Sequence, residues 1–243
     1  MAAPERIAIA AEGVDVWRIP LDGSATGDAD LLSAAERERA GRFRAEMDRD
    51  RFVRSHVALR RILGQYAATG PSDLVFGAGE HGKPFIESPT AARALRFSLS
   101  HSGELALLAV ARDREVGVDL ERVRPVSGMA EMVARYFSAF ERPALERIAP
   151  AERRRAFFAT WVLKEAYLKA CGDGLVRRLE DFDVTVGEEP PRLIAVRDRP
   201  GDEGRWILSS LDAGEGYVAA LAVEYSGRWL RQSHFSGALN TSS

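Results

Sequence analysis

One order of structural elements occurs twice along the chain, and each occurrence ends in a similar hairpin. Segments with a helical apolar period are followed both times by segments that alternate apolar and polar residues, as strands do. The last hairpins read Ser-Gly-Glu-Leu-Ala-Leu-Leu-Ala-Val at 102–110 and Ala-Gly-Glu-Gly-Tyr-Val-Ala-Ala-Leu-Ala-Val at 213–223. Any two buried hairpins share some likeness, so the repeated order carries more weight. It predicts an α+β fold of two pseudo-symmetric α/β halves, each with helices packed on an antiparallel sheet.

The periodicity also predicts where the elements and the halves lie. The expected helices are 31–44, 49–68, 128–137, 139–148 and 151–171. The expected strands are 14–19, 84–86, 95–100, 105–111, 116–121, 182–186, 192–196, 205–211 and 217–224. A turn at 112–114 separates an N-terminal half, 1–114, from a C-terminal half, 115–226. The polar residues 227–243 are expected to form a loose tail.

Composition excludes several classes of protein. The 34 basic and 36 acidic residues give a net charge of −2, without the basic excess of a nucleic-acid binder. The single cysteine, Cys171, excludes an internal disulfide framework and a multi-cysteine zinc site. The longest apolar runs, 105–111 and 217–223, are too short to span a bilayer. The first residues lack the apolar region of a signal peptide. We therefore expect a cytoplasmic protein that binds neither nucleic acid nor membrane.

Lysine is used at only three positions, Lys83, Lys164 and Lys169, although the chain has 34 basic residues. A compositional bias towards arginine explains this in most chains. The alternative is that these three sites need the compact charge of an ammonium group.

Two carboxylates share one face of the expected strand 116–121. Side chains two residues apart on a strand point the same way, so Asp119 and Glu121 lie together while Val118 and Leu120 enter the core. Paired oxygen ligands suit Mg²⁺, which commonly binds one or two carboxylates together with substrate phosphates. From the spacing alone, a solvated edge strand is the commoner explanation.

The expected helix 151–171 carries a second set of charges. Glu165 and Lys169 are four residues apart, in the order that favours a surface ion pair. The other interpretation makes Glu165 a third metal ligand or a base, with Lys169 directed at the same anion. Phe157, Phe158 and Trp161 make the helix apolar, which favours the functional interpretation.

Cationic and hydroxyl groups gather in the N-terminal half. Ser100 and His101 lie in the segment Phe-Ser-Leu-Ser-His-Ser-Gly, whose turn could seat a phosphate, although a histidine in a turn is often only a turn residue. Neighbouring strand residues point in opposite directions, so the two are poorly placed as a nucleophile and its base. Residues 36–61 contain nine arginines against five acids, a pattern of an anion site or of a solvated helix face.

Together, three carboxylates and several phosphate-type cationic donors indicate metal-assisted phosphoryl transfer. The sequence contains no Gly-x-x-x-x-Gly-Lys-Ser/Thr motif and no His-Glu-x-x-His motif, so P-loop nucleotide-binding and zinc-protease functions lack support.

Four ordered motifs resemble those of the Sfp-type 4′-phosphopantetheinyl transferases. They are Gly82-Lys83-Pro84, the segment 97–103, Gly117-Val-Asp119-Leu-Glu121, and Trp161-x-x-Lys164-Glu165-Ala-x-x-Lys169-x-x-Gly172-x-Gly174-Leu175. The resemblance covers roughly residues 35–190, and the last two motifs in this order are its specific part. Leu120 stands where isoleucine is common, and Ala166 where serine also occurs.

The resemblance implies transfer of the phosphopantetheine arm of coenzyme A to a serine of an apo acyl or peptidyl carrier protein, releasing adenosine 3′,5′-bisphosphate. It implies Mg²⁺ bound by Asp119, Glu121 and Glu165, with Glu165 also the candidate base and Lys169 neutralising the departing phosphate. It further implies that the N-terminal half is the phosphate-binding side, through the residues Arg51, Lys83, Ser100 and His101, with Lys169 from the other half and Arg39 as a weaker candidate. A monomer is expected, since two similar halves can complete one site.

Two alternatives stay open at this point: another Mg²⁺-dependent phosphoryl or nucleotidyl transferase, and a silent partner of a synthase that retains the fold. The carrier surface is a guess from Arg122 and Arg124, followed by Met129, Met132 and Val133. A basic rim beside adaptable methionines suits several partners, although the methionines could equally be core residues.

Overall fold

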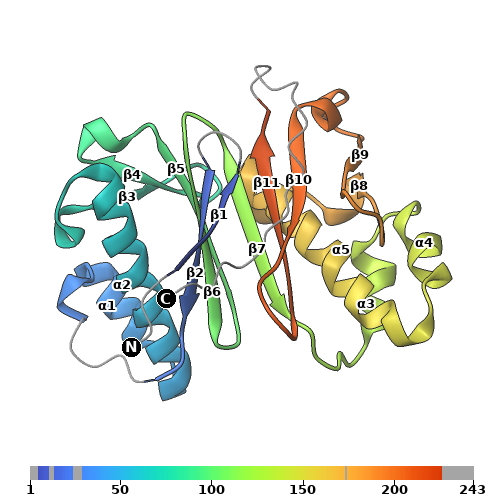
Figure 1. Ribbon diagram of the computed structural model, residues 1–243, viewed down its shortest axis with the longest axis horizontal. Helices are drawn as coiled ribbons and strands as arrows, with labels where there is room; N and C mark the ends of the chain where they lie inside the picture. The colour runs from blue at the N-terminus through green and yellow to red at the C-terminus, as the bar shows by residue number, and fades with distance from the viewer. Residues whose placement is uncertain (1–4, 11–13, 24–28, 173, 226–243) are drawn as a thin grey trace, which may run out of the picture. The chain divides into compact units, whose positions relative to one another are not determined.

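The computed structural model describes residues 5–10, 14–23, 29–172 and 174–225, and the chain divides into two compact units (Figure 1). The first unit comprises residues 1–79 and 84–113, and the second comprises 80–83 and 114–243. The segment 80–83 therefore belongs to the second unit, whereas the sequence-based boundary assigns it to the first half.

The first unit is an antiparallel sheet with a long helix against it. The sheet order is β1-β2-β6-β5. Its strands are β1 (Glu5–Ala10), β2 (Val14–Pro20), β5 (Leu95–Ser102) and β6 (Leu105–Arg112), its helices are α1 (Ala34–Gly41) and α2 (Glu46–Ala67), and a small hairpin is formed by β3 (Val75–Ala78) and β4 (Pro84–Ser88). The helix expected at 49–68 is confirmed as α2, whose Leu59, Ile62 and Leu63 are buried in one cluster with Phe97 and Leu108 of the sheet.

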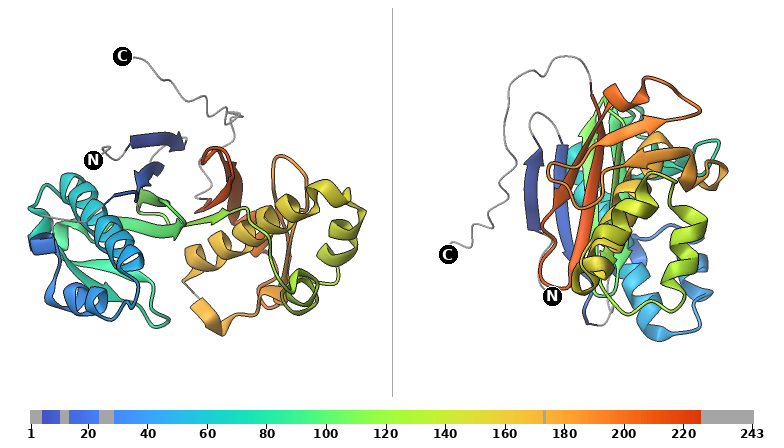
Figure 2. Two further views of the ribbon diagram at one scale, coloured as in Figure 1. Left: turned by 90° about the horizontal axis from the view of Figure 1, so that it is seen from below. Right: turned by 90° about the vertical axis from the view of Figure 1, so that its right-hand side faces the viewer.

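The second unit has the same kind of construction. Its main sheet has the order β10-β11-β7, all antiparallel. Its strands are β7 (Val116–Arg122), β10 (Trp206–Leu211) and β11 (Tyr217–Glu224), its helices are α3 (Met129–Tyr136), α4 (Glu141–Arg147) and α5 (Pro150–Cys171), and its small hairpin is β8 (Phe182–Val184) with β9 (Leu193–Val196). Helix α5 lies along the sheet and contacts β7 and β11 (Figure 2).

The two units repeat one topology. In each, a strand is followed by a short helix, a 22-residue helix, a small hairpin and two further strands. The sheet orders β2-β6-β5 and β7-β11-β10 correspond strand by strand, while β1 and α3 are additions to one unit each. The predicted fold class, helices on antiparallel sheets in two similar halves, is confirmed.

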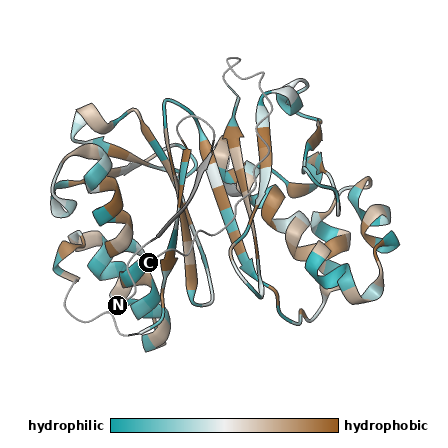
Figure 3. Cartoon of the chain, in the orientation of Figure 1, coloured by the Kyte–Doolittle hydropathy of each residue, from teal (hydrophilic) through white to brown (hydrophobic). Residues whose placement is uncertain are grey.

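The structure differs from the sequence-based expectations in detail. Helix α1 is shorter than the predicted helix 31–44, because Ser33 caps it and a separate 3-10 turn lies at Ala29–Leu31. Strands β1 and β3 were not expected, and the predicted loose tail lies outside the described residues. Hydrophobic and hydrophilic residues are interspersed along the helices (Figure 3), and none in the described ranges is long and apolar enough to cross a membrane.

Candidate active site

Helix α5 approaches strand β7 unusually closely at Gly117. A Cβ atom on Gly117 would lie 2.0 Å from the carbonyl oxygen of Ala166 and 2.4 Å from the backbone nitrogen of Ala170. Only glycine leaves room for this contact between strand and helix backbones. Because side chains alternate along a strand, Asp119 and Glu121 lie on the same side as Gly117, the side that α5 covers.

Asp119 on β7 and Lys169 on α5 form an ion pair near this contact. Lys169 Nζ lies 2.6 Å from Asp119 Oδ1, and only 5% of Asp119 is exposed. Although β7 is the edge strand of its sheet, Asp119 is thus buried, and the solvated-strand explanation does not apply to it. Lys169 therefore forms an ion pair between the helix and the strand.

Glu165 lies in the same group of charges. Burial raises the pKa of the Glu165 carboxyl, the negative charges of Asp119 and Glu121 raise it further, and the Lys169 ammonium lowers it. The structure therefore brings together Asp119, Glu121, Glu165 and Lys169, although their predicted roles stay predictions.

The donors of this group fit Mg²⁺ chemically. Asp119, Glu121 and Glu165 offer only carboxylate oxygens, and their charges repel one another unless a cation lies among them. In the described part of the chain, however, no group of three or more His, Cys, Asp and Glu side chains is arranged to hold a metal ion. In this arrangement Lys169 occupies one Asp119 oxygen, so a metal would have to share that carboxylate with the ammonium group.

Lys83 is held at the carboxyl end of α5. Its Nζ lies 2.5 Å from Glu115 Oε2 and 2.6 Å from the carbonyl oxygen of Ala170. The glycines of the last motif make room for this turn, because a Cβ on Gly172 would lie 3.1 Å from the Lys83 side chain and one on Gly174 would lie 2.9 Å from the carbonyl oxygen of His81. Gly172 is also the left-handed cap of α5, a position that glycine favours. The predicted phosphate contact of Lys83 stays a prediction.

The first unit holds Arg51, Ser100 and His101. Arg51 on α2 lies 3.8 Å from Glu104, which follows β5. On β5, Ser100 is buried and His101 is exposed, as expected for neighbouring strand residues whose side chains point in opposite directions. Their contact with coenzyme A phosphates stays a prediction.

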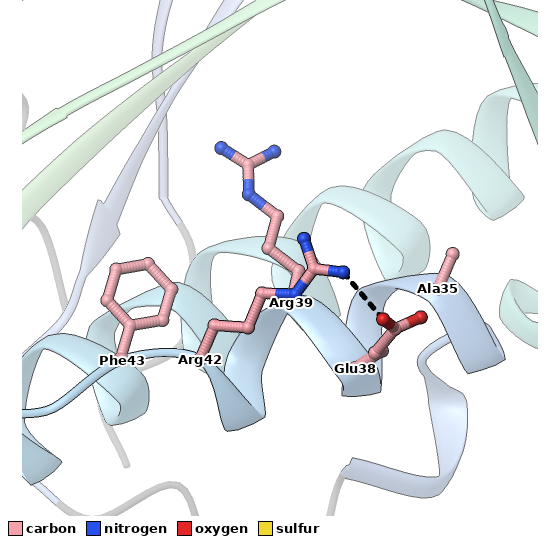
Figure 4. Close-up of a pocket in the computed structure, with 5 residues that line it drawn as sticks. All are labelled: Ala35, Glu38, Arg39, Arg42 and Phe43. Atoms are coloured by element: carbon pink, nitrogen blue, oxygen red, sulfur yellow. Dashed lines mark hydrogen bonds and ion pairs between the residues drawn. The ribbon is translucent and has the colours of Figure 1, made fainter.

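A pocket of about 500 Å³ lies on α1 and the residues after it, lined by Ala35, Glu38, Arg39, Arg42 and Phe43 (Figure 4). Glu38 and Arg42 form an ion pair of 2.6 Å, while the Arg39 guanidinium lies over the Phe52 ring, 5.2 Å from its centroid. The weaker sequence candidate Arg39 therefore lines a pocket.

Sequence reasoning missed His56, which stacks on the Phe52 ring at 3.9 Å between centroids. The pKa of His56 is lowered to about 4, mainly by burial and also by the positive charges of Arg39 and His101. A hydrogen bond to the Phe52 carbonyl and the charge of Glu36 act in the opposite direction. His56, Arg39 and His101 thus share one electrostatic environment. The available signal was a histidine within the apolar stripe of α2.

The suggested carrier surface divides into two parts. Arg122 and Arg124 are exposed, whereas Met129, Met132 and Val133 are half-buried and pack against the core of the second unit. The structure therefore favours a core role for the methionines.

Lys164 is completely buried, and its Nζ lies 2.5 Å from Glu141 Oε1. Burial lowers the pKa of Lys164, and the Glu141 carboxylate raises it again. A fully buried ammonium group does not contact substrate.

The closely packed helix and strand and the grouped carboxylates lie in a chain built from two units of one topology. Both units match family models: residues 17–113 match the N-terminal domain of 4′-phosphopantetheinyl transferase, and residues 115–222 match the 4′-phosphopantetheinyl transferase superfamily.

Relatives agree with these matches over most of the chain. The chain is 35% identical over 223 residues to the 4′-phosphopantetheinyl transferase HetI of Nostoc sp., covering 90% of this chain and 91% of the relative. It is 27% identical over 196 residues to the 4′-phosphopantetheinyl transferase Sfp of Bacillus subtilis, covering 80% and 83%. A crystal structure of the Thermotoga maritima holo-[acyl-carrier-protein] synthase aligns with 45% of this chain and 62% of its own, at 24% identity and a TM-score of 0.38.

The chain belongs to the 4′-phosphopantetheinyl transferase superfamily. It is an enzyme that transfers the phosphopantetheine group to carrier proteins, in a family that depends on coenzyme A.

Proposed function

We propose that the transfer takes place on the face where α5 covers β7, and that it requires Mg²⁺. The observation that carries this proposal is the group formed by Asp119, Glu165 and Lys169, in which a buried carboxylate is paired with an ammonium group beside a carboxyl of raised pKa. Carboxyl groups with perturbed pKa values beside a specific charge partner are enriched at functional sites.

The proposed reaction is an in-line displacement at the β-phosphorus of coenzyme A. A bond forms between that phosphorus and the hydroxyl oxygen of the carrier serine, and the bond to the bridging pyrophosphate oxygen breaks, releasing adenosine 3′,5′-bisphosphate. Glu165 accepts the proton of the serine, directly or through a water molecule. Lys169 neutralises the departing phosphate.

Asp119, Glu121 and Glu165 are the residues that would hold Mg²⁺. The ion supplies neutralisation of pyrophosphate charge when it is bound. Asp119 is kept in place by Lys169, and the packing at Gly117 fixes the separation between the strand and the helix that carry the ligands.

The phosphates of coenzyme A are assigned to cationic groups. In the first unit we propose Arg51, Ser100 and His101, with Arg39 as a second candidate because it lines a pocket. In the second unit we propose Lys83 and Lys169, the lysines whose side chains retain solvent exposure. Arginine binds phosphate oxygens through paired N–H donors, whereas lysine offers them a compact positive charge.

For the acceptor we propose that Arg122 and Arg124 face an acidic carrier protein, since both are exposed, Arg122 as the last residue of β7 and Arg124 just after it. We further propose that the protein acts as a monomer in the cytoplasm. Its single cysteine leaves no internal disulfide, which fits a reducing compartment.

The test is to incubate the protein with coenzyme A and an apo carrier protein and to weigh the carrier by mass spectrometry. The carrier should gain the mass of phosphopantetheine with Mg²⁺, should gain none after EDTA treatment, and should gain it again when Mg²⁺ is restored. Transfer that continues at full rate in EDTA would contradict the metal requirement. No mass gain with any of several acyl and peptidyl carriers would contradict the proposed reaction.

A further inference from the structure

The two units share a buried structural feature beyond their common topology. In each, the carboxylate of a capping-box glutamate binds a buried cation of the 22-residue helix. In the second unit the pair is Glu141 and Lys164, both with fully buried side chains. In the first unit it is Glu36 and Arg60, with 2% of the Arg60 side chain exposed.

The glutamates are equivalent because each closes a capping box with a serine three residues earlier. Glu36 Oε2 accepts the backbone N–H of Ser33 at 2.7 Å, and Ser33 Oγ accepts the backbone N–H of Glu36 at 3.2 Å. In the second unit, Glu141 Oε2 accepts the N–H of Ser138 at 2.9 Å, and Ser138 Oγ accepts the N–H of Glu141 at 3.2 Å. Each box leaves its glutamate carboxylate able to bind a second donor.

The cations are equivalent by position and by surroundings. Arg60 and Lys164 both lie 14 residues after the first residue of their helix. Arg60 donates to the carbonyls of Pro71 and Leu74, at 3.0 and 2.9 Å, and lies 5.0 Å from the centroid of the Phe76 ring in β3.

Lys164 makes the matching contacts in the second unit. It donates to the carbonyl of Phe182 at 2.7 Å and lies 4.3 Å from the Phe182 ring centroid in β8. Both cations therefore join three elements, namely the short helix with the capping box, the long helix, and the first strand of the small hairpin.

The residues that follow these cations differ between the units. The positions after Arg60 that correspond to Glu165 and Lys169 hold Arg61 and Gln65. The buried pair is thus present in a unit whose long helix lacks the carboxylate and the lysine of the α5 group. This separates the pair from phosphoryl-transfer chemistry and assigns it to the position of the helix.

We propose that the ion pairs Glu36–Arg60 and Glu141–Lys164, called the clamps below, are equivalent in the two units and fix the position of the long helix in each. We further propose that Lys164 is a positioning residue that holds α5, and thereby Glu165, against β7. The kinetic part of this inference rests on the proposed role of Glu165, whereas the structural part does not.

The test compares Lys164→Met with Arg60→Met, using Arg155→Met, an exposed residue of α5, as the matched control. Removing one partner of a buried pair should lower the Tm of both clamp variants by roughly 6–12 °C, and that of the control by far less.

Lys164→Met should lower kcat for carrier modification at least about tenfold with KM for coenzyme A within about threefold. Arg60→Met should instead keep kcat within about threefold and raise KM for coenzyme A, because α2 carries Arg51.

Two further variants keep the inference testable if Lys164→Met does not fold. Glu141→Gln retains an oxygen for the capping box but removes the charge, and should give the same loss of kcat in milder form. Lys164→Arg, which places the cation of the other clamp in this one, should recover part of the lost kcat and Tm.

Three results would overturn the inference. They are a Tm of Lys164→Met within about 2 °C of the unmodified protein, a loss of kcat without any loss of Tm, and the same kinetic change in both clamp variants. If the unmodified enzyme failed to load a carrier, the proposed function would fail, while the Tm comparison would still test the clamps.

Discussion

Replacing Gly117 by alanine tests whether the separation of α5 and β7 controls the reaction. The added Cβ would lie 2.0 Å from the Ala166 oxygen, whereas ordinary contacts begin at 3.4 Å, so α5 or β7 must shift. Reaching an ordinary contact needs a shift of about 1.4 Å, and a misplacement of only about 1 Å can already reduce a rate about 100-fold. Overpacking of this kind also costs about 1–3 kcal/mol of the free energy of unfolding.

The assay is kcat for carrier modification at saturating coenzyme A and carrier, measured by mass spectrometry together with a thermal melt. Gly204→Ala is the matched control, because a Cβ on Gly204, in the same unit, would meet nothing within 4 Å. We expect Gly117→Ala to lose about two orders of magnitude in kcat and the control to retain its rate. A Gly117→Ala protein with unchanged kcat and unchanged Tm would refute the argument that this contact sets the geometry of the site.

Three further predictions concern single side chains. His56 has a pKa of about 4 in the folded chain against an ordinary value of 6.5, so the folded state binds fewer protons between these values. The contribution of His56 to the free energy of unfolding is complete above about pH 6.5 and declines as the pH falls, by about 2 kcal/mol at pH 4.5. His56→Gln should reduce this part of the pH dependence in denaturant melts. A pH profile of stability that is unchanged in His56→Gln would contradict this assignment. Lys169→Arg should lower kcat at least about tenfold, because a guanidinium is bulkier than the ammonium group paired with Asp119; a rate equal to that of the unmodified enzyme would remove the need for a compact charge. Arg124→Glu should raise KM for an acidic carrier without changing KM for coenzyme A, and equal KM values for the carrier would exclude Arg124 from that surface.

Local sequence patterns predicted the elements better than the contacts between them. The period-2 and period-3.6 patterns located the helices and most strands, and the repeated order indicated two similar halves. The spacing of Glu165 and Lys169 instead suggested a surface pair within one helix. The structure pairs Lys169 with Asp119, 50 residues away, because Gly117 lets the helix backbone lie directly on the strand. A glycine within a buried strand was the signal for that approach.

Other contacts of the structure could be predicted from the sequence only in part. Lys83 binds the Ala170 carbonyl 87 residues away, which no local pattern indicates. The two Ser-x-x-Glu boxes are readable from the sequence, but the burial of Lys164 beside one of them is not. His56 was overlooked because its neighbours on α2 are apolar core residues.

The most direct test of the central claim, that the α5–β7 face carries out the transfer, is the rate of Glu165→Gln. Glutamine keeps the shape of the side chain but removes its charge and its capacity to accept a proton. Glu152→Gln, at an exposed position in the first turn of the same helix, is the control. We predict that Glu165→Gln loses at least about 100-fold in kcat with an unchanged melt, while Glu152→Gln behaves as the unmodified enzyme. A Glu165→Gln protein that loads the carrier at the normal rate would contradict the account.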